Sequence, residues 1–401
     1  MEDASAQRRE IREEGFIPLH PASPSEPNIF RVQDVDRMLA VAVENKASDV
    51  VFGAGESVWV RIHGQWLRGS KRVMVPTEVD ELLNGLSRSP SSSAQTSSGM
   101  DLDFKYDVYV SRFSKLRFRV NATACQDERG RGVEITMRSI PGAPPSLDDM
   151  GVEEGILRCL YPIFGLVLVT GPVGSGKTTL LASALAKSAK TSPRRILTYE
   201  SPVEFDLKSV EGRIAPVTQT EIPSDLVSGW AGAVRNSLRR AGDIVLFGES
   251  RDYETMAGML QAAETGVSVY STSHTNGVAD TISRIADVFP WEERNGMIRK
   301  MISSLRLIVN QRLFPRMGGG RVAVREFLEF DSVLRKEVLN LPFEQIIPFL
   351  LEAVDNRGQS MAKASHLAKE RGEITDETLD SILQAVDSEA MTVRRKSERV
   401  A

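Results

Sequence analysis

The sequence predicts an α/β protein in which a parallel sheet, built from alternating strands and helices, follows a smaller domain with antiparallel strands. Four short apolar runs, GLVLVT, RILTY, DIVLF and SVYST, are too brief for helices and are separated by helical patterns. Strand–helix–strand units of a parallel sheet have this pattern. Two earlier segments alternate apolar and polar residues, which is typical of half-buried strands. From about Leu334 apolar residues recur at helical spacing, so we expect the chain to end in helices.

The composition narrows the class of protein. Of 401 residues, 41% are hydrophobic and 26% charged, and the net charge is −4, which predicts no strong general attraction to nucleic acid. The two cysteines, Cys125 and Cys159, match neither a disulfide framework nor a CxxC motif. No apolar stretch reaches the roughly 20 residues of a membrane helix, and the N-terminus lacks an apolar signal segment. We therefore expect a cytoplasmic protein without direct membrane insertion.

The first part of the chain predicts a tail and a small domain. Residues 1–30 are charged and then rich in proline and serine, so we expect a mobile tail. A domain over 31–142 begins with an amphipathic helix that ends near Asn45, followed by a strand in VWVRIHG. Residues 87–100 hold seven serines in fourteen positions. Because such a segment buries little apolar surface, it predicts a flexible loop.

An antiparallel hairpin closes this domain. In KLRFRVNA and GVEITMR the apolar residues alternate with polar ones, and the exposed face carries Arg117, Arg119 and Arg138. The proline-rich stretch that follows predicts a linker over 143–155. The α/β domain then covers 156–333, and a helical region covers 334–401.

The strongest motif is GPVGSGKT, which fits G-x-x-x-x-G-K-[ST] and lies between a predicted strand and a predicted helix. In such a phosphate loop, glycines let backbone N–H groups surround phosphates at a helix N-terminus. Lys177 reaches the β- and γ-phosphates, and the Thr178 hydroxyl binds Mg²⁺. The sequence thus predicts a site for a nucleoside triphosphate and Mg²⁺. Its nucleotide-binding residues are Gly171, Pro172, Val173, Gly174, Ser175, Gly176, Lys177, Thr178 and Thr179.

Carboxylates follow two of the predicted strands. Glu249 ends DIVLFGE, and Glu200 and Glu204 lie in YESPVEF. Ligands of parallel sheets bind at the carboxyl ends of the strands. We expect Glu249 either to hold Mg²⁺ through water or to polarise the attacking water, and Glu200 is a candidate general base.

His274 and the three hairpin arginines have two interpretations each. His274 follows the strand SVYST, and is either a structural histidine or a residue that senses phosphate or couples subunits. Arg117, Arg119 and Arg138 either form a solvated strand face or act as arginine fingers that compensate charge on the γ-phosphate.

Taken together, the motifs resemble the ATPases of type II and type IV secretion, which include PilT-like pilus retraction motors and the DotB/TraJ-like ATPases of type IVB secretion and conjugation. The resemblance runs from about Val32 to about Val386. The matching segments are NKASDV, RFRVNA, RSIP, GPVGSGKTT, YESPVEF, QTEI, FGESRDYET, AAETG, TSHTNGVADTISRI and GGRVA.

This resemblance implies a PAS-like N-terminal domain, a RecA-like ATPase domain and a homohexamer that works with inner-membrane components. Glu200 and Glu204 fall in the family's acidic box, Glu249 in its Walker B element and His274 in its histidine box. Arg117, Arg119 and Arg138 match positions from which the family supplies arginines to the nucleotide. The protein would lie at the cytoplasmic face of the inner membrane through its protein partners.

Some residues depart from the family pattern. Ser201 replaces an acidic-box aspartate, and Val267 replaces a histidine ahead of the histidine-box strand. The segment after NKASD continues to Val51, where PilT-like relatives have a histidine, and an AIRNLIRE-like segment is missing. The absence of that segment, together with VWVRIHG and HTNGVADTISRI, favours the DotB/TraJ-like branch. A pilus retraction motor is the alternative, and a nucleic-acid translocase or a scaffold without turnover are weaker ones.

Overall fold

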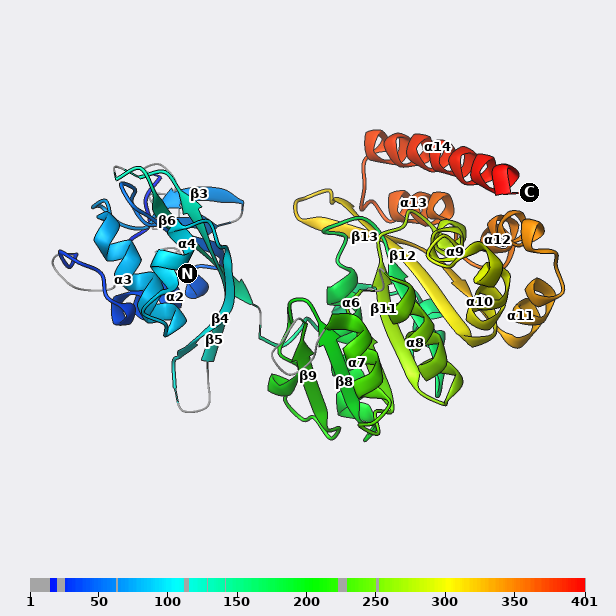
Figure 1. Ribbon diagram of the computed structural model, residues 1–401. Helices are drawn as coiled ribbons and strands as arrows, with labels where there is room; N and C mark the ends of the chain where they lie inside the picture. Colours follow the sequence, from blue (N-terminus) through cyan, green and yellow to red (C-terminus); the bar gives the residue numbers. More distant parts are fainter. Residues whose placement is uncertain are drawn as a thin grey trace. The chain divides into compact units, whose positions relative to one another are not determined.

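Figure 1 shows the computed structural model of the chain, which divides into two compact units, 1–142 and 143–401. Each unit is described by itself. The structure describes residues 15–19, 26–62, 64–111, 115–127, 129–140, 142–222, 229–249 and 252–400, the last eleven without their side chains.

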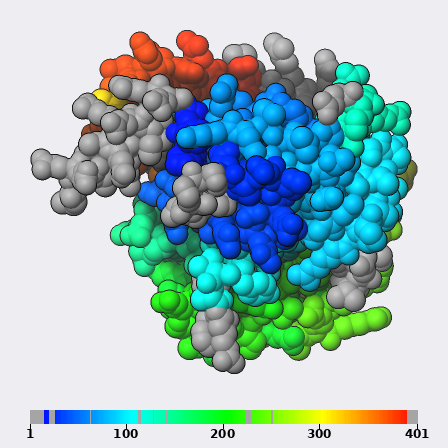
Figure 2. Space-filling model, turned by 90° about the vertical axis from the view of Figure 1, so that its left-hand side faces the viewer, coloured from blue at the N-terminus to red at the C-terminus, as the bar shows by residue number. Residues whose placement is uncertain are grey.

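The first unit is an antiparallel sheet with helices on one face. In its described residues the strand order is β3-β2-β1-β6-β5-β4. The strands are β1 (Ala47–Gly53), β2 (Trp59–Ile62), β3 (Gln65–Arg68), β4 (Leu102–Tyr109), β5 (Lys115–Cys125) and β6 (Gly132–Ile140). The helices are α2 (Val32–Glu44), α3 (Pro76–Ser87) and α4 (Ser92–Ser97). In Figure 2 the early described segments of this unit, in shades of blue, lie together at the surface.

Alternation along the strands separates a buried face from a polar face. Phe118 and Val120 on β5 pack with Met137 on β6 in one core with the helices. The residues between them, such as Arg119 and Arg138, are cross-strand partners on the other face. The predicted hairpin and the predicted helix ending near Asn45 are therefore both present.

Three stretches of the N-terminal half differ from the sequence prediction. Part of the expected mobile tail is ordered, because Ile17 and Leu19 are buried in the core and their N–H groups donate to the carbonyls of Arg68 and Gly69. Residues 1–14 and 20–25 lie outside the described part. The expected flexible loop 87–100 contains α4, whose Ser92 and Thr96 are buried.

Hydrogen bonds explain why a serine-rich stretch folds. The Ser87 hydroxyl donates to Ser92 Oγ at 2.8 Å, and the Ser93 N–H donates to Asn84 Oδ1 at 2.9 Å. Short polar side chains thus replace apolar contacts with local hydrogen bonds to α3. The expected linker 143–155 is also partly regular: it contains a 3₁₀ turn, η1 (Leu147–Met150), and the start of α5 (Glu154–Cys159), and belongs to the second unit.

The second unit is a mostly parallel sheet of strand order β13-β12-β7-β11-β10-β8-β9, in which β13 is antiparallel to β12. The predicted runs form four of its strands: β7 (Gly165–Thr170), β8 (Ile196–Glu200), β10 (Ile244–Phe247) and β11 (Ser268–Ser273). The others are β9 (Val217–Glu221), β12 (Leu305–Pro315) and β13 (Arg321–Glu329). The predicted parallel sheet is therefore confirmed, and the β12–β13 hairpin extends it at one edge.

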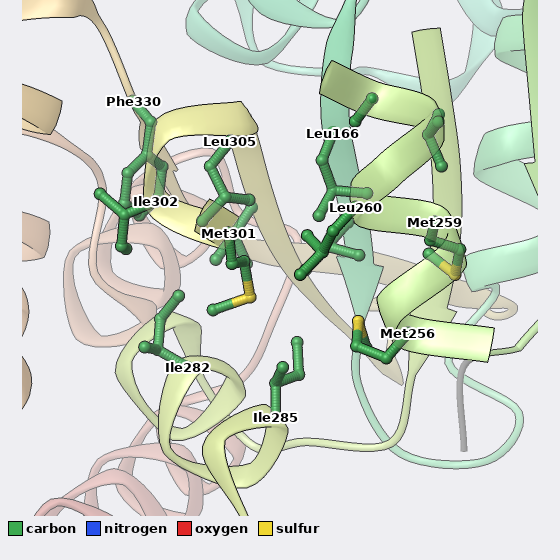
Figure 3. Close-up of a cluster of buried hydrophobic side chains, with 14 of the residues drawn as sticks. Leu166, Met256, Met259, Leu260, Ile282, Ile285, Met301, Ile302, Leu305 and Phe330 are labelled. Carbon is green, nitrogen blue, oxygen red and sulfur yellow. The ribbon is translucent and has the colours of Figure 1, made fainter. Parts of the chain in front are cut away.

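Helices cover both faces of this sheet, so its strands are buried on both sides. On one face Leu166 and Leu168 of β7 join a core with α7 (Gly229–Ser237), α8 (Tyr253–Glu264), α9 (Val278–Ala286) and α10 (Trp291–Ser304). The side chains from β7, α8, α9 and α10 point toward one another in Figure 3. On the other face Val167 and Val169 pack with α5 and α6 (Lys177–Thr191). A second 3₁₀ turn, η2 (Leu207–Ser209), lies against α6.

Helices end the chain, as the apolar stripes predict. They are α11 (Ser332–Leu339), α12 (Phe343–Arg357), α13 (Met361–Glu370) and α14 (Asp376–Val400). The first two extend the core around α9 and α10, and α13 and α14 pack together near β13. In the part of the chain that the structure describes, no helix has both the length and the apolar character to cross a bilayer.

Candidate functional site

The phosphate-loop motif connects the end of β7 to the start of α6, as its flanking patterns predict. Gly171, Gly174 and Gly176 have φ angles of 138°, 76° and 82°, a region that side chains rarely adopt. A Cβ on Gly171 would also lie 2.2 Å from the carbonyl oxygen of Gln311 on β12. Glycine is therefore required by both the backbone angle and the packing. Pro172 and Val173 are exposed at the tip of the loop.

Lys177, the first residue of α6, is buried, with 7% of its surface exposed. Its Nζ donates to the carbonyls of Gly171 and Pro172, each at 2.9 Å, and lies 3.3 Å from His274 Nδ1. Burial lowers the pKa of Lys177, whereas the nearby negative charges of Glu249 and Glu204 raise it. The ammonium is thus held inside the loop beside carboxylates that favour its charge.

A cavity of about 330 Å³ brings the predicted catalytic residues of the second unit together. Lys177 and Thr178 line it from the loop side, and His274 lines it from the end of β11. Glu200, Glu204 and Glu249 are among its other lining residues. Because parallel strands end at the same edge of the sheet, residues far apart in sequence meet here.

His274 lies between the lysine and one of these carboxylates. Its Nδ1 faces Lys177, and its Nε2 lies 3.5 Å from Glu249 Oε1. Since the lysine ammonium only donates, this geometry suits an imidazole with its proton on Nε2. His274 and Glu249 are 37% and 20% exposed in their side chains, so both remain accessible to a ligand in the cavity.

The two acidic-box carboxylates have different environments. Glu200 is 5% exposed, and its Oε1 accepts hydrogen bonds from Thr198 at 2.5 Å and from Gln219 at 3.2 Å. Glu204 hydrogen-bonds Thr178; burial raises its pKa, while that bond and the charge of Lys177 lower it. Glu200 is fixed by its neighbours, whereas Glu204 lies against the loop hydroxyl.

A larger cavity, of about 900 Å³, also borders the loop and shares Lys177, Thr178 and Glu204 with the smaller one. Residues 174–179, which include Thr179, form one part of its wall, and residues 149–151 form another. The remaining lining comes mainly from β12, β13 and the α13–α14 connection, and includes Arg316, Arg321, Arg325 and Arg371. Both cavities have carboxylates in their walls, and the larger one has four arginines as well.

Sequence reasoning missed Gln311 and Arg325, which are both buried at 1% exposure on the β12–β13 hairpin. The nearest motif in the sequence is GGRVA at the start of β13, which includes neither residue and does not indicate a function for them. The departures at Ser201 and Val267 are placed differently. Ser201 lines the smaller cavity, whereas Val267 packs partly buried against the apolar core.

Arg117, Arg119 and Arg138 lie on the polar face of the first unit, each beside an aspartate. Arg138 Nε lies 2.7 Å from an oxygen of Asp49, which is buried. Arg119 and Arg117 lie 3.5 Å and 3.7 Å from oxygens of Asp103 and Asp107. The structure therefore brings these arginines together on one sheet face, in a unit separate from the phosphate loop.

The chain is similar in sequence and in fold to a family of known proteins. The family model described as type II/IV secretion system protein matches residues 27–329. The chain belongs to this family. It is 35% identical to the type IV pilus retraction ATPase PilT of Pseudomonas aeruginosa over 326 residues, which cover 81% of this chain and 90% of PilT.

Two solved structures share its fold over most of their length. The ATPase DotB of Legionella pneumophila is 37% identical, with a TM-score of 0.80 over 90% of this chain and 98% of DotB. The pilus retraction motor PilT with bound ADP is 30% identical, with a TM-score of 0.74 over 87% of this chain and 96% of that structure. The predicted fold class, a P-loop ATPase domain with a preceding α+β domain and C-terminal helices, is confirmed.

Proposed function

We propose that this family member binds ATP at its phosphate loop and hydrolyses it to drive a secretion machine. The observation that carries this proposal is the smaller cavity, where Lys177 and Thr178 face three carboxylates and His274. Hydrolysis needs positive charge on the phosphates and a group that orients water, and both are present. The bound ADP of the PilT structure, at 30% identity, supports the same use of the loop.

Each residue has a proposed role in that reaction. Lys177 holds the β- and γ-phosphates, with backbone N–H groups of residues 173–179 around them. Glu249 orients the attacking water, and His274, between Glu249 and Lys177, senses the γ-phosphate. Glu200 and Glu204 supply further negative charge at the same edge, and Glu200 is the alternative general base.

The residues present fit a Mg²⁺ ion bound together with the nucleotide. The described residues contain no cluster of three or more side chains that would form a self-sufficient metal centre. Magnesium bound to a nucleotide takes few protein ligands, and it prefers oxygen. Thr178 would bind it directly, and Glu249 would hold it through water. The ion would neutralise charge on the transferring phosphate.

We further propose that Arg117, Arg119 and Arg138 act on the nucleotide of a neighbouring subunit in a homohexameric ring. Their aspartate partners leave the guanidinium groups partly exposed, at 25%, 46% and 66% of the side chain. Partly exposed ion pairs such as those with Asp107 and Asp103 contribute only about 0–1 kcal/mol, so Arg117 and Arg119 can exchange the aspartate for a phosphate at little cost. Arg138 would leave the buried Asp49 with the Ser48 hydroxyl as a remaining partner. The family resemblance supports such a ring.

The machine that we propose is a type IVB secretion or conjugation apparatus, with the ATPase held at the cytoplasmic face of the inner membrane by protein partners. The structural match to DotB supports this assignment. The alternative is a pilus retraction motor, which the sequence match to PilT favours. Both functions use the same chemistry and differ in the partner.

Identifying the proteins that bind this chain in the cell distinguishes the secretion or conjugation ATPase from the pilus retraction motor. The Glu249→Gln chain should retain ATP and stay engaged with its partner, so we would express it with a tag in the native cell and identify copurifying proteins by mass spectrometry. Core components of secretion or conjugation would support the first assignment. Pilin and pilus platform proteins would establish the alternative. A Lys177→Ala chain is the matched control, because it should capture neither set through ATP.

A further inference from the structure

The backbone carbonyls of the phosphate loop need partners of their own. A loop that turns its N–H groups toward phosphates directs carbonyls toward the protein, where each requires a donor. The carbonyl of Ser175 accepts a hydrogen bond from Gln311 Nε2 at 2.7 Å. A Cβ on Gly176 would lie 2.9 Å from the same Nε2. Gln311 is therefore packed directly against the loop.

Arg325 determines which way the Gln311 amide points. The Arg325 Nε donates to Gln311 Oε1 at 2.7 Å. A guanidinium has only donors, so it selects the oxygen end of the amide and turns the NH₂ group toward Ser175. Both side chains are 1% exposed, which removes water as a competing partner.

The other donors of Arg325 reach residues 150–153. Nη1 donates to the carbonyl of Gly151 and to a carboxylate oxygen of Glu153, both at 3.1 Å, and Nη2 donates to the carbonyl of Met150 at 3.2 Å. Met150 and Gly151 line the same 900 Å³ cavity as the loop. One chain of hydrogen bonds, buried at Gln311 and Arg325, thus joins two walls of that cavity.

We propose that Gln311 and Arg325 are positioning residues that hold the phosphate loop in its nucleotide-binding shape and at a fixed distance from residues 150–153. This rests on the proposed function of the loop. Neither side chain contacts the reacting atoms in this scheme. A loop that already has its binding shape loses no further conformational entropy when phosphate binds. Gln311 and Arg325 should therefore affect nucleotide affinity more than the rate of the chemical step.

Gln311→Glu is the test, because it keeps the acceptor for Arg325 and removes the donor to Ser175. We would titrate a fluorescent ADP analogue, measure kcat and KM for ATP, and measure Tm without nucleotide. We expect Kd and KM to rise about tenfold, the effect of about 1.4 kcal/mol, with kcat within about twofold. Tm should fall by about 2–8 °C, because the carbonyl of Ser175 loses its buried donor, and the chain should remain folded. Gln345→Glu makes the same change on the exposed surface of α12, and should match the parent.

Parental Kd and KM in a folded Gln311→Glu chain would overturn the proposal. Should that chain fail to fold, Arg325→Lys tests the same link, since lysine keeps the charge near Glu153 without the planar group that fixes the amide. Weaker ADP binding in this variant supports the proposal, and parental affinity contradicts it. If the parent chain itself binds no ADP, the proposed function fails together with the link.

Discussion

Polar side chains are held differently in the two units. Around the phosphate loop Lys177, Gln311 and Arg325 are buried, and the structure gives each several hydrogen bonds. On the polar face of the first unit, Arg119 and Arg138 remain about half exposed beside single aspartates. Losing a buried partner leaves a desolvated group and costs about 1–3 kcal/mol, whereas exposed pairs contribute about 0–1 kcal/mol.

The two regions therefore differ in how firmly their polar side chains are held: the loop region is fixed, and the arginine face is the adjustable region, because its side chains can change partners. The loop region has one arrangement that its neighbours determine, as a binding site for phosphate requires. On the arginine face, Arg117 and Arg119 have partly exposed aspartate partners that they can exchange at little cost, as groups that meet a ligand only part of the time require. Substitutions in the first region should therefore abolish binding or chemistry, and those in the second should reduce turnover alone.

Lys177→Ala should have the largest effect. It removes the only charged donor inside the loop, at the point where phosphate charge is highest, so we expect ATP turnover to fall roughly 1000-fold. Phosphate release and binding of a fluorescent ATP analogue would both be measured. Lys190→Ala, at an exposed position of the same helix, should behave like the parent. Parental turnover in Lys177→Ala would refute the site.

Glu249→Gln should separate binding from chemistry. The amide keeps the size of the side chain but no longer accepts a proton or polarises water as a carboxylate does, so we expect kcat to fall about 100-fold with ATP affinity within about threefold. Single-turnover hydrolysis and ATP titration measure the two. Glu254→Gln, exposed in the first turn of α8, is the control. Unchanged kcat would move the role to Glu200.

Arg138→Ala tests the adjustable region. We expect turnover to fall about tenfold, less than the loss of a lone arginine finger, because Arg117 and Arg119 lie on the same face. ATP binding to single subunits should stay parental, as measured by titration of the analogue at low protein concentration. Arg131→Ala, at an exposed position before β6, should leave both unchanged. Equal loss in Arg131→Ala would show a general charge effect instead.

The smallest effect concerns pH and Glu326, whose carboxylate accepts N–H groups at the starts of α9 and α13. Burial raises the pKa of Glu326, although those N–H groups and the charge of Arg312 lower it. The folded chain thus holds this proton more tightly than the unfolded chain, so its contribution to stability is present at low pH and is lost as pH rises through the raised pKa.

The amide of Glu326→Gln does not titrate, so the variant lacks this pH-dependent contribution. The Tm of the variant minus that of the parent should therefore increase as pH rises from about 4.5 toward 8, by roughly 2 to 4 °C. Thermal unfolding across this pH range measures it. Glu370→Gln, at an exposed position of α13, should show no such trend. A difference that falls with pH would contradict the sign.

The same contrast explains how much the sequence could predict. The loop and the strands ending at Glu200, Phe247 and Ser273 follow local rules, since apolar runs and glycine spacing are visible without any contact information. Glu204, Glu249 and His274 were found because each comes shortly after a strand of the sheet, and such residues share one edge.

Buried polar residues could not be found in this way. Asn310, Gln311 and Arg312 are consecutive polar residues of β12, all at most 9% exposed, and such a run predicts a surface segment rather than a central strand. Their partners come from distant segments, such as Thr275 and Ser175. Ser92 misleads in the same manner, because it is buried with a hydrogen bond from the Ser87 hydroxyl that composition does not reveal.

The central claim is that the nucleotide site of one subunit works with the arginines of another. Co-expression of differently tagged Lys177→Ala and Arg138→Ala chains tests it, with ATP turnover measured on assemblies purified through both tags. The first chain keeps its arginines and the second keeps its phosphate loop. The account predicts turnover several times above that of either variant assembled alone. Turnover no greater than the average of the two would contradict it.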